Sequence, residues 1–363
     1  MSTSPIAFFL PSVRAGGAQR VIVNLAQGMT ARGIPVDVVL ATKDGAFLDQ
    51  LPATVRLVDL RAGRLFRSLA PLITYLRRER PRVLVSSMSH ANLIAIWAGR
   101  LAGRRTPVVV TVHTTASQSN TPGGWVLSRL IRTFYPRASS VVAVSQGAAD
   151  DIARSSGVPR ERVRVIYNPV ITPALLQQIG QTPTHPWFAP GRPPVILGVG
   201  RLTAAKDFPT LIRAFAQVRR HRNVHLMIVG EGEERGRLET LVRELGLDDV
   251  VSLPGYQENA GAYMAKSALF VLSSAWEGLP TVLIEALAAG ARVVSTDCPS
   301  GPREILQQGR LGTLVPVGDV ARLAEAMISS LDRPPSTDPA EGLLPFTRDV
   351  AVDEYLRLIE GAR

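Results

Sequence analysis

The sequence has one cysteine, Cys298, among 363 residues, so a disulfide within the chain is excluded. This fits a reducing compartment, and we expect a cytoplasmic protein. Long apolar runs are also missing: none reaches the roughly 18 residues that a membrane-spanning helix requires. The apolar stretch near the N-terminus is short and follows no basic residues, unlike a signal peptide. A hydrophobic content of 46% instead indicates a globular chain with a sizeable core.

Several motifs of nucleotide and metal sites are absent. The sequence contains neither GxGxxG nor GxxxxGK[ST], which argues against a dinucleotide-binding protein and a P-loop NTPase. It contains no Asp-x-Asp, and its five histidines lack the spacing of metal ligands. We therefore expect no metal ion and no cofactor.

Lysine is scarce, and the charge is uneven. Of 41 basic residues only Lys43, Lys206 and Lys266 are lysines. Residues 1–170 hold 22 basic and 8 acidic residues, a net charge of +14, whereas residues 171–363 hold 19 and 22, a net charge of −3. A basic half favours an acidic partner. We find no aromatic-interleaved RNA-binding motif, so we expect no nucleic-acid partner.

Short apolar runs alternate with amphipathic helical stretches along most of the chain, which predicts an α/β fold with parallel sheets covered on both faces. The alternation stops in a Pro-rich segment, residues 171–194, which we interpret as a linker. We predict one domain over residues 1–170 and a second over 195–345. A last amphipathic helix, residues 346–363, is expected to pack back on the first domain. Ligands of such sheets bind at the carboxyl ends of the strands, so we expect the site in the cleft between the domains.

The stretch EGLPTVLIEALAAG places two acids around the start of a predicted helix. Pro280 suits a first helical turn and Gly290 a helix end, so Glu277 lies in the entering loop and Glu285 inside the helix. The N–H groups near Gly278, Leu279, Pro280 and Thr281 would then form an anion site. Glu277 alone is also explained by the helix dipole. Glu285 lies among apolar residues, so it should have a partner, for which sugar hydroxyls would serve.

Two cations follow the first strand of the second predicted domain, in GVGRLTAAKDF. Arg201 and Lys206 there suit a diphosphate, although a solvated pair of cations is the ordinary alternative. In the first domain, Gly16 and Gly17 lie where a strand turns into a helix. Their missing side chains would let a ligand approach the backbone closely, and a simple tight turn is the alternative interpretation. His113 ends the strand PVVVTVH, and by itself it is equally consistent with a satisfied core histidine.

Together these motifs resemble the family 4 retaining glycosyltransferases, whose GT-B fold has two Rossmann-like domains. The resemblance covers nearly the whole chain, and it rests on GGAQRV, VVVTVH, VIYNPV, GVGRLTAAKDFPTLIRAF, VGEGEE, VVSLPGY and SSAWEGLPTVLIEALAAGARVVSTDCPSGPREIL. The family often has an acid after GGA, where this chain has Gln19, and we assign that position no role. The family also varies around His113.

The resemblance implies a role for each motif in binding a nucleotide sugar. Arg201 and Lys206 would grip the donor diphosphate, while Gly17 and the N–H groups of Gly278 to Thr281 would hold phosphates and sugar. Glu285 would bind the ribose hydroxyls and Tyr256 would lie near the base. Glu277 would face the transferred sugar, with His113 as a second catalytic or positioning group.

The reaction implied is the transfer of a hexose or N-acetylhexosamine, with retained configuration and without a metal. We expect a uridine rather than a guanosine nucleotide. No carboxylate is clearly placed as a nucleophile, which favours front-face displacement, with the cations stabilising the leaving diphosphate. A sugar-nucleotide epimerase of the same fold and a non-catalytic nucleotide-sugar-binding partner remain alternatives.

The basic half suggests an anionic membrane surface and a lipid-linked or surface-glycan acceptor. Two stretches mix arginine with apolar residues: RLFRSLAPLITYLRRERPR and GGWVLSRLIRTFYPR. The second contains Trp125, Leu127, Leu130, Ile131 and Phe134 beside Arg129, Arg132 and Arg137. Either the apolar residues are core and the arginines solvated, or the stretch is an interfacial surface. The second interpretation predicts a bacterial enzyme peripherally bound at the inner face of the plasma membrane.

Overall fold

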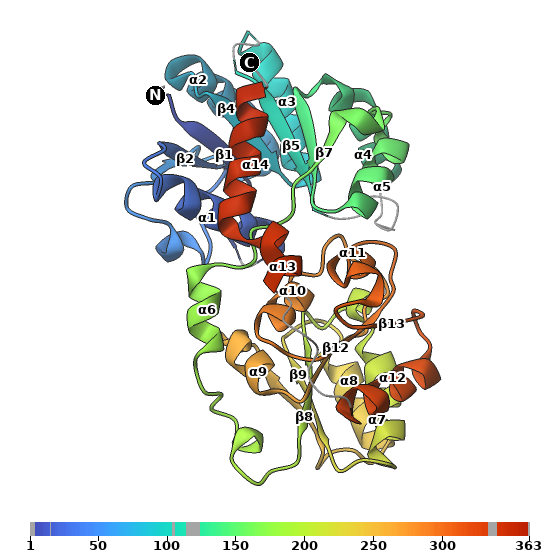
Figure 1. The fold of residues 1–363 in the computed structure, drawn as a ribbon. Helices are drawn as coiled ribbons and strands as arrows, with labels where there is room; N and C mark the ends of the chain where they lie inside the picture. Colours follow the sequence, from blue (N-terminus) through green and yellow to red (C-terminus); the bar gives the residue numbers. More distant parts are fainter. Residues whose placement is uncertain (1–3, 15, 104–105, 114–123, 333–339, 362–363) are drawn as a thin grey trace. The chain divides into compact units, whose positions relative to one another are not determined.

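The chain folds into two compact units, drawn as a ribbon in Figure 1. The computed structural model describes residues 4–14, 16–103, 106–113, 124–332 and 340–361. One unit comprises Met1–Pro169 and Pro345–Arg363, and the other comprises Val170–Leu344. The chain therefore builds the first unit, builds the second, and returns to the first with its last helix.

The first unit contains a seven-stranded parallel sheet in the order β3-β2-β1-β4-β5-β6-β7. Its strands are β1 (Ile6–Leu10), β2 (Val36–Leu40), β3 (Arg56–Asp59), β4 (Val83–Ser87), β5 (Val108–Val112), β6 (Ser140–Ala143) and β7 (Val163–Val165). Its longer helices are α1 (Gly17–Thr30), α2 (Leu69–Glu79), α3 (Ser89–Leu101), α4 (Gly124–Phe134), α5 (Gln146–Ser156) and α14 (Arg348–Gly361). The chain leaves β1 and β4 toward opposite sides of the sheet, so the sheet has a topological switch point between these two strands.

The second unit contains a six-stranded parallel sheet in the order β10-β9-β8-β11-β12-β13. Its strands are β8 (Val195–Val199), β9 (His225–Val229), β10 (Val251–Gly255), β11 (Leu269–Leu272), β12 (Val293–Thr296) and β13 (Thr313–Val315). Its helices are α6 (Pro173–Ile179), α7 (Phe208–Arg219), α8 (Arg235–Glu244), α9 (Ala260–Lys266), α10 (Thr281–Ala288), α11 (Pro302–Ile305), α12 (Val320–Asp332) and α13 (Ala340–Leu343). Here the switch point lies between β8 and β11.

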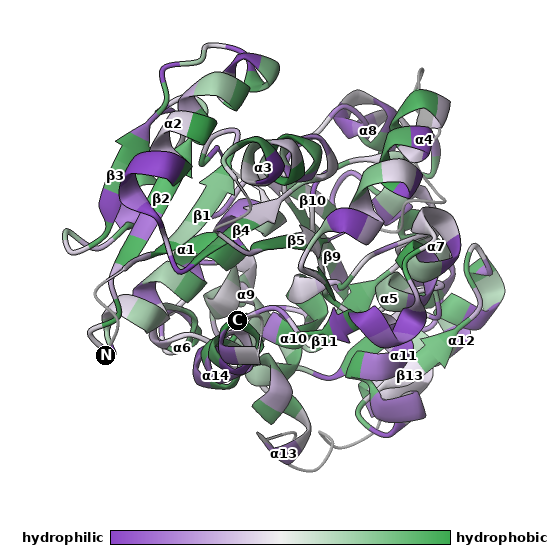
Figure 2. Cartoon of the chain, turned by 90° about the horizontal axis from the view of Figure 1, so that it is seen from above, coloured by the Kyte–Doolittle hydropathy of each residue, from purple (hydrophilic) through white to green (hydrophobic). Residues whose placement is uncertain are grey.

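The continuous apolar runs of the sequence are the central strands of these sheets. The strands β1, β2, β4 and β5 are buried along their whole length, as expected for parallel strands covered on both faces. In Figure 2 the hydrophobic colour concentrates on strands such as β1, whereas the helices carry both colours. The predicted α/β fold with two parallel-sheet domains is therefore confirmed.

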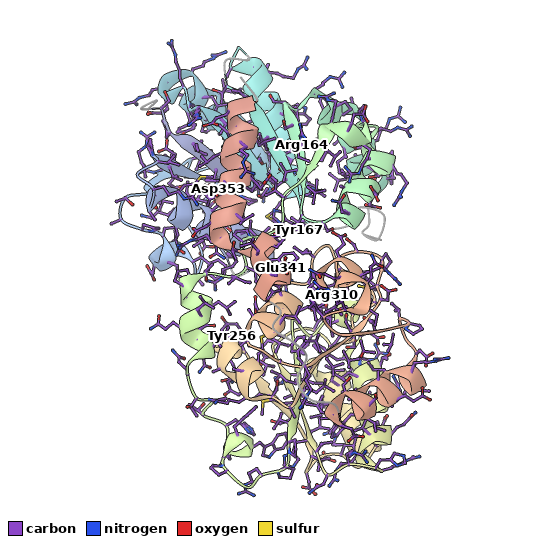
Figure 3. All side chains as sticks on the ribbon, viewed as in Figure 1. Arg164, Tyr167, Tyr256, Arg310, Glu341 and Asp353 are labelled. Atoms are coloured by element: carbon purple, nitrogen blue, oxygen red, sulfur yellow. The ribbon has the colours of Figure 1, made fainter. Side chains whose placement is uncertain are left out.

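The last helix belongs to the first unit. On α14, Val352, Tyr355 and Ile359 are buried in the same core as β1. Where α14 crosses α1, a Cβ added at Gly28 would lie 2.8 Å from Val352 Cγ2, so glycine permits the close approach. Asp353, labelled on α14 in Figure 3, forms an ion pair with Arg32 at the end of this contact. The segment 171–194, interpreted above as a linker, contains helix α6 and groups with the second unit.

Candidate active site

The loops that follow β8 and β11 form the centre of the candidate site in the second unit. These strands are hydrogen-bonded neighbours, and their connections lead away to α7 and α10 on either side of the switch point. Open α/β sheets bind ligands at such a point, outside the carboxyl ends of the strands. The loop after β8 carries Arg201 and Lys206, and the loop after β11 carries Glu277. Residues from two predicted motifs therefore meet at one sheet edge.

Lys206 and Glu277 are in direct contact. The ammonium Nζ of Lys206 lies 2.5 Å from Oε1 of Glu277, and both side chains are largely buried, with 17% and 14% of their surface exposed. The hydroxyl of Ser274 donates a second hydrogen bond, 2.7 Å long, to the same carboxylate oxygen. Two charge-assisted contacts thus hold the acid in one orientation at the sheet edge.

The two loops are also joined through their backbones. The N–H of Ala275 donates to the carbonyl oxygen of Ala205 at 2.8 Å, and the hydroxyl of Ser273 donates to the carbonyl oxygen of Lys206 at 2.7 Å. Sequence reasoning assigned no role to Ser273 or Ser274. Serines that follow a buried strand at a sheet edge are the signal that would have identified them, because buried hydroxyls require partners.

Local backbone geometry explains where Lys206 lies. It ends the 3₁₀ turn Ala204–Lys206, after which Asp207 adopts a left-handed conformation with φ 43° and α7 begins. A Cβ added at Gly200 would lie 2.9 Å from Cε of Lys206, so the glycine leaves the space that the lysine stem occupies. Arg201, on the same loop, is exposed to solvent. Of the two predicted cations, only Lys206 is therefore in contact with Glu277.

The helix that follows Glu277 begins one residue later than predicted. Pro280 is the N-cap of α10, which runs from Thr281 to Ala288, and Gly290 follows with φ 74°. Gly278, Leu279 and Pro280 are all buried, so the approach to the helix is packed within the protein. Glu285 lies on α10 and is half-buried.

A neighbouring loop supports the start of α10. The hydroxyl of Ser300, after β12, donates to the carbonyl oxygen of Gly278 at 2.7 Å. At Gly301 the backbone has φ 95°, and an added Cβ would lie 2.4 Å from Cδ of Pro280. Glycine is required there both for the backbone conformation and for the space. Ser300 and Gly301 are a second support that the sequence alone did not identify.

Tyr256 and Cys298 lie on other loops of the same sheet edge. Tyr256 follows β10 and is 67% exposed; Figure 3 labels it. Cys298 follows β12 and is buried. Burial and the nearby Glu277 carboxylate raise the pKa of the Cys298 thiol to about 12. Because the thiolate is the nucleophilic form, this cysteine is excluded as a nucleophile at neutral pH.

In the first unit, His113 directly follows β5. The hydroxyl of Thr111 donates its one proton to the carbonyl oxygen of Ser86 at 3.0 Å. The Thr111 oxygen also lies 2.6 Å from Ser87 Oγ and 3.0 Å from His113 Nε2. One ring nitrogen of His113 is therefore engaged within the first unit.

The other ring nitrogen of His113, Nδ1, is available to a ligand. Nδ1 is buried and has no hydrogen-bond partner among the described residues. Burial lowers the pKa of His113 to about 4, so the imidazole is neutral at physiological pH. A hydroxyl both donates and accepts, so a substrate hydroxyl can pair with Nδ1 of this neutral ring.

The two predicted glycines of the first unit lie at the start of α1. Gly16 is its N-cap in an extended conformation, and Gly17 is its first residue. A Cβ added at Gly17 would meet no atom within 4 Å, so the backbone there is open to a ligand. Gly17 follows β1 and His113 follows β5, so both lie at the carboxyl edge of the first sheet.

The described residues hold neither a metal-ligand cluster nor a membrane-spanning helix. Within the part of the chain that the structure describes, no three His, Cys, Asp or Glu residues gather closely enough to hold a metal ion. Among the same residues, no helix combines the length and the apolar character needed to cross a lipid bilayer.

Comparison with known proteins finds a family match for each half of the chain. Residues 15–172 match the family described as Glycosyltransferase Family 4, and residues 185–340 match Glycosyl transferases group 1. The lipopolysaccharide core biosynthesis glycosyltransferase LpsE of Rhizobium meliloti is 30% identical over 358 residues, covering 95% of this chain and 96% of LpsE.

A second relative comes from Campylobacter jejuni. Its N-acetylgalactosamine-N,N'-diacetylbacillosaminyl-diphospho-undecaprenol 4-alpha-N-acetylgalactosaminyltransferase is 32% identical over 248 residues, 68% of this chain and 66% of that protein. Among solved structures, Anabaena HepE in complex with UDP and glucose superposes with a TM-score of 0.79 at 22% identity, covering 99% of this chain and all of HepE. The structural likeness shows that the fold is GT-B. With the sequence matches, it shows that this chain belongs to the family 4 glycosyltransferases.

Proposed function

We propose that this glycosyltransferase moves a hexose or an N-acetylhexosamine from a nucleoside diphosphate sugar to a lipid-linked or surface-glycan acceptor, with retention of the anomeric configuration. The observation that carries the proposal is the contact between Lys206 and Glu277 at the β8/β11 switch point. A cation suited to a diphosphate and an acid suited to sugar hydroxyls are held side by side where such a sheet binds its ligand. UDP is the favoured nucleotide, since HepE was solved with UDP and glucose.

The donor would replace part of the interactions that these residues make with each other. Within the described residues, Lys206 and Ser274 both contact Oε1 of Glu277, so Oε2 can accept from a hydroxyl of the transferred sugar. A diphosphate beside Lys206 would pair with its ammonium group in place of Glu277, and exposed Arg201 would be the second cation. The N–H groups of Gly278, Leu279 and Thr281 would hold phosphate and sugar oxygens, since Pro280 between them has no N–H.

The remaining contacts orient the two ends of the nucleotide sugar. Glu285 would accept hydrogen bonds from the ribose hydroxyls, and exposed Tyr256 would lie against the base. In the first unit, open Gly17 and the bare Nδ1 of His113 would approach the sugar. His113 would make one hydrogen bond there and would not act as a charged acid, because burial keeps its ring neutral.

Transfer would follow front-face displacement. The bond between the anomeric carbon and the diphosphate breaks while the acceptor oxygen attacks from the same face, and a leaving phosphate oxygen takes the acceptor proton. Lys206 and Arg201 would stabilise the charge that grows on the leaving group. In this proposal the two cations would supply the stabilisation that a metal ion could otherwise give, so we propose a metal-independent reaction.

A donor panel on the purified protein tests this function. Release of nucleotide is measured for UDP- and GDP-linked glucose, galactose, N-acetylglucosamine and N-acetylgalactosamine, with lipid-linked acceptors and without. Acceptor-dependent release from one donor, with the α-configured product by NMR, supports the proposal. Conversion of the donor sugar to its epimer would instead identify an epimerase, and binding without any turnover would identify a non-catalytic nucleotide-sugar-binding protein.

With this acceptor, the enzyme would act at the inner face of the plasma membrane. LpsE is named for lipopolysaccharide core biosynthesis, and the Campylobacter relative is named for a diphospho-undecaprenol acceptor. We propose that the basic first unit binds anionic lipid there as a peripheral enzyme of bacterial surface-glycan assembly. Each basic residue near such a surface contributes about 1 kcal/mol.

The structure narrows the surface that would meet the membrane. On α4, Trp125 is 74% exposed and Val126 is 42% exposed, whereas Ile131 is buried. The apolar residues of α2 are also largely core, but Phe66 just before it is 64% exposed. The expectation that Ile131 belongs to an interfacial surface is wrong, because its side chain packs inside the unit. The candidate surface is therefore the exposed start of α4, with Trp125 and Val126 beside Arg129, Arg132 and Arg137, and exposed Phe66 is a separate candidate.

Flotation with liposomes tests the membrane proposal. The protein should float with anionic vesicles at low salt, and less so at high salt or with neutral vesicles. Replacement of Arg129, Arg132 and Arg137 by Gln should reduce flotation. Replacement of three exposed arginines of the second unit, Arg213, Arg220 and Arg243, removes the same charge and should not. Equal loss in both triple variants would leave only a general charge effect and remove the proposed surface.

A further inference from the structure

Met88 has a backbone conformation that methionine rarely adopts. It lies between β4 and α3 with φ 79° and ψ 132°, a region occupied almost only by glycine. Its side chain is 41% exposed. An exposed apolar side chain on a strained backbone stabilises nothing in the core, and such strain gathers at ligand sites. The function proposed above uses neither feature.

The position of Met88 in the sheet gives it a place beside a ligand. It directly follows β4, which pairs with β1 on one side and with β5 on the other. It therefore lies at the switch point of the first sheet, one strand from the loop after β1 and one strand from His113. This is the position at which an open parallel sheet binds its ligand.

Gln19 reaches Met88 from the other side of the switch point. It lies on the first turn of α1, and its Nε2 contacts Sδ of Met88 at 3.7 Å. A Cβ added at Gly16 would lie 2.5 Å from Oε1 of Gln19, so this glycine provides the space for the amide. The two side chains together bridge the loops that follow β1 and β4.

The chemistry of this pair is neutral. A thioether offers an apolar, polarisable surface, and a carboxamide offers both a donor and an acceptor. The described cations nearest in sequence are engaged elsewhere: Arg14 pairs with Asp44, and Arg20 contacts Gln50 and the ring of Phe47. Such a surface suits an uncharged sugar ring, with C–H groups or an acetamido methyl on the thioether and a hydroxyl on the amide. It does not suit a diphosphate.

The function proposed above places the nucleotide on the second unit and the acceptor's membrane surface on the first. We therefore propose that Met88, backed by Gln19, is a specificity-determining residue that contacts the neutral terminal sugar of the acceptor, next to the donor sugar that Gly17 and His113 would approach. This inference rests on the glycosyltransferase function proposed above. The left-handed backbone holds the methionine side chain at the switch point, and Gln19 holds its sulfur. Acceptors ending in a hexose or an N-acetylhexosamine would be distinguished by how they cover the thioether.

Methyl NMR tests the contact without requiring turnover. The other described methionines, Met29, Met227, Met264 and Met327, are fully buried, and the spectrum of Met88→Leu identifies the Met88 signal. The probes are the methyl glycosides of glucose, galactose, N-acetylglucosamine and N-acetylgalactosamine, with glucuronic acid as an anionic comparison. We expect a saturable shift of the Met88 methyl signal with at least one neutral glycoside, and a weaker response in Gln19→Ala than in Gln27→Ala on the same helix. No shift with any neutral glycoside would overturn the proposal.

Kinetics give a second, independent readout once a donor is found. Met88→Gly relieves the strained backbone and removes the side chain, so we expect a higher Tm together with altered acceptor choice. The ratio of kcat/KM between hexose- and N-acetylhexosamine-terminated acceptors should change about tenfold, as expected for loss of one apolar side-chain contact. Met88→Leu, which keeps most of the apolar surface, should change it less. An unchanged ratio in Met88→Gly would show that Met88 has only a structural role. Failure of the donor panel with an intact NMR response would count against the proposed reaction and leave the sugar contact standing.

Discussion

Nζ of Lys206 donates a hydrogen bond to Oε1 of Glu277 at 2.5 Å, although 71 residues separate the two in the chain. The contact joins the loops that follow β8 and β11, and Ser274 donates a further hydrogen bond to the same oxygen. A cation and an acid that neutralise each other in the absence of ligand can be separated by a ligand that offers both an anion and hydroxyl groups. A nucleoside diphosphate sugar has both.

Glu277→Gln should abolish transfer and leave nucleotide binding largely intact. The amide retains the size of the side chain and can still accept from Ser274, but it lacks the charge beside the transferred sugar. Turnover with the preferred donor and nucleotide affinity by calorimetry are the measurements. Glu325→Gln, an exposed acid on α12, is the matched control. Near wild-type turnover in Glu277→Gln would contradict the assignment.

Lys206→Ala and Arg201→Ala should each weaken the binding of the nucleoside diphosphate. A charge-assisted contact contributes about 1.5–3 kcal/mol, or roughly ten- to a hundredfold in affinity. The effect of Lys206→Ala should be the larger, since it also leaves largely buried Glu277 without its partner. Lys266→Ala, at the end of α9, controls for the loss of a lysine. Unchanged diphosphate affinity in both variants would exclude the loop after β8 from donor binding.

Activity should persist in EDTA. We expect the leaving diphosphate to be stabilised by Lys206 and Arg201, so removal of divalent ions should leave the rate unchanged. The rate is measured after dialysis against the chelator and again after magnesium or manganese is restored. Strict dependence on a divalent ion would refute the metal-independent reaction.

Asp37→Asn should destabilise the first unit. On β2, Asp37 is 2% exposed, pairs with Arg56 on β3 and accepts from the hydroxyl of Tyr75 at 2.5 Å. Loss of the charge weakens both contacts, and we expect a decrease of about 1.5–3 kcal/mol in the free energy of unfolding. Tyr75→Phe removes one of the contacts and should have the smaller effect. Denaturant unfolding measures both, and equal stability of Asp37→Asn and wild type would show that the network contributes nothing.

Stability should fall as the pH drops from about 6.5 toward 4. Burial lowers the pKa of His113 to about 4 and also lowers the pKa of His185 and of His225. For His225, the nearby charges of Arg219 and Arg192 lower the pKa further. Below the ordinary histidine pKa of about 6.5, the unfolded chain therefore binds more protons than the folded protein does. Acid consequently favours unfolding. Each histidine contributes a slope of at most about 1.4 kcal/mol per pH unit.

Histidine variants isolate this effect. In His113→Asn and His225→Asn, the free energy of unfolding should fall less steeply between pH 6.5 and 4 than in the wild type. His221→Asn, an exposed position, is the control. An identical pH dependence in all variants would show that acid acts through other groups.

The sequence by itself determined the class of fold and the identity of most candidate residues. Continuous apolar strands between amphipathic helices are a local signal, because each strand buried on both faces must be apolar throughout. Strand β3 lacks this signal, since it is an edge strand whose Arg56 and Asp59 are exposed. The acids, cations and glycines were recognised because they break the apolar pattern at strand ends.

Only the tertiary structure decided which of these residues meet. Periodicity shows that β8 and β11 exist, but not that they are neighbours, because strand order depends on packing between segments distant in the chain. That order brings Lys206 to Glu277 and leaves Arg201 exposed. It also leaves Ile131 in the core and Trp125 at the surface, although both belong to one amphipathic stretch. The strained backbone of Met88 was likewise invisible in the sequence, since methionine carries no conformational signal of its own and only its neighbours hold it there.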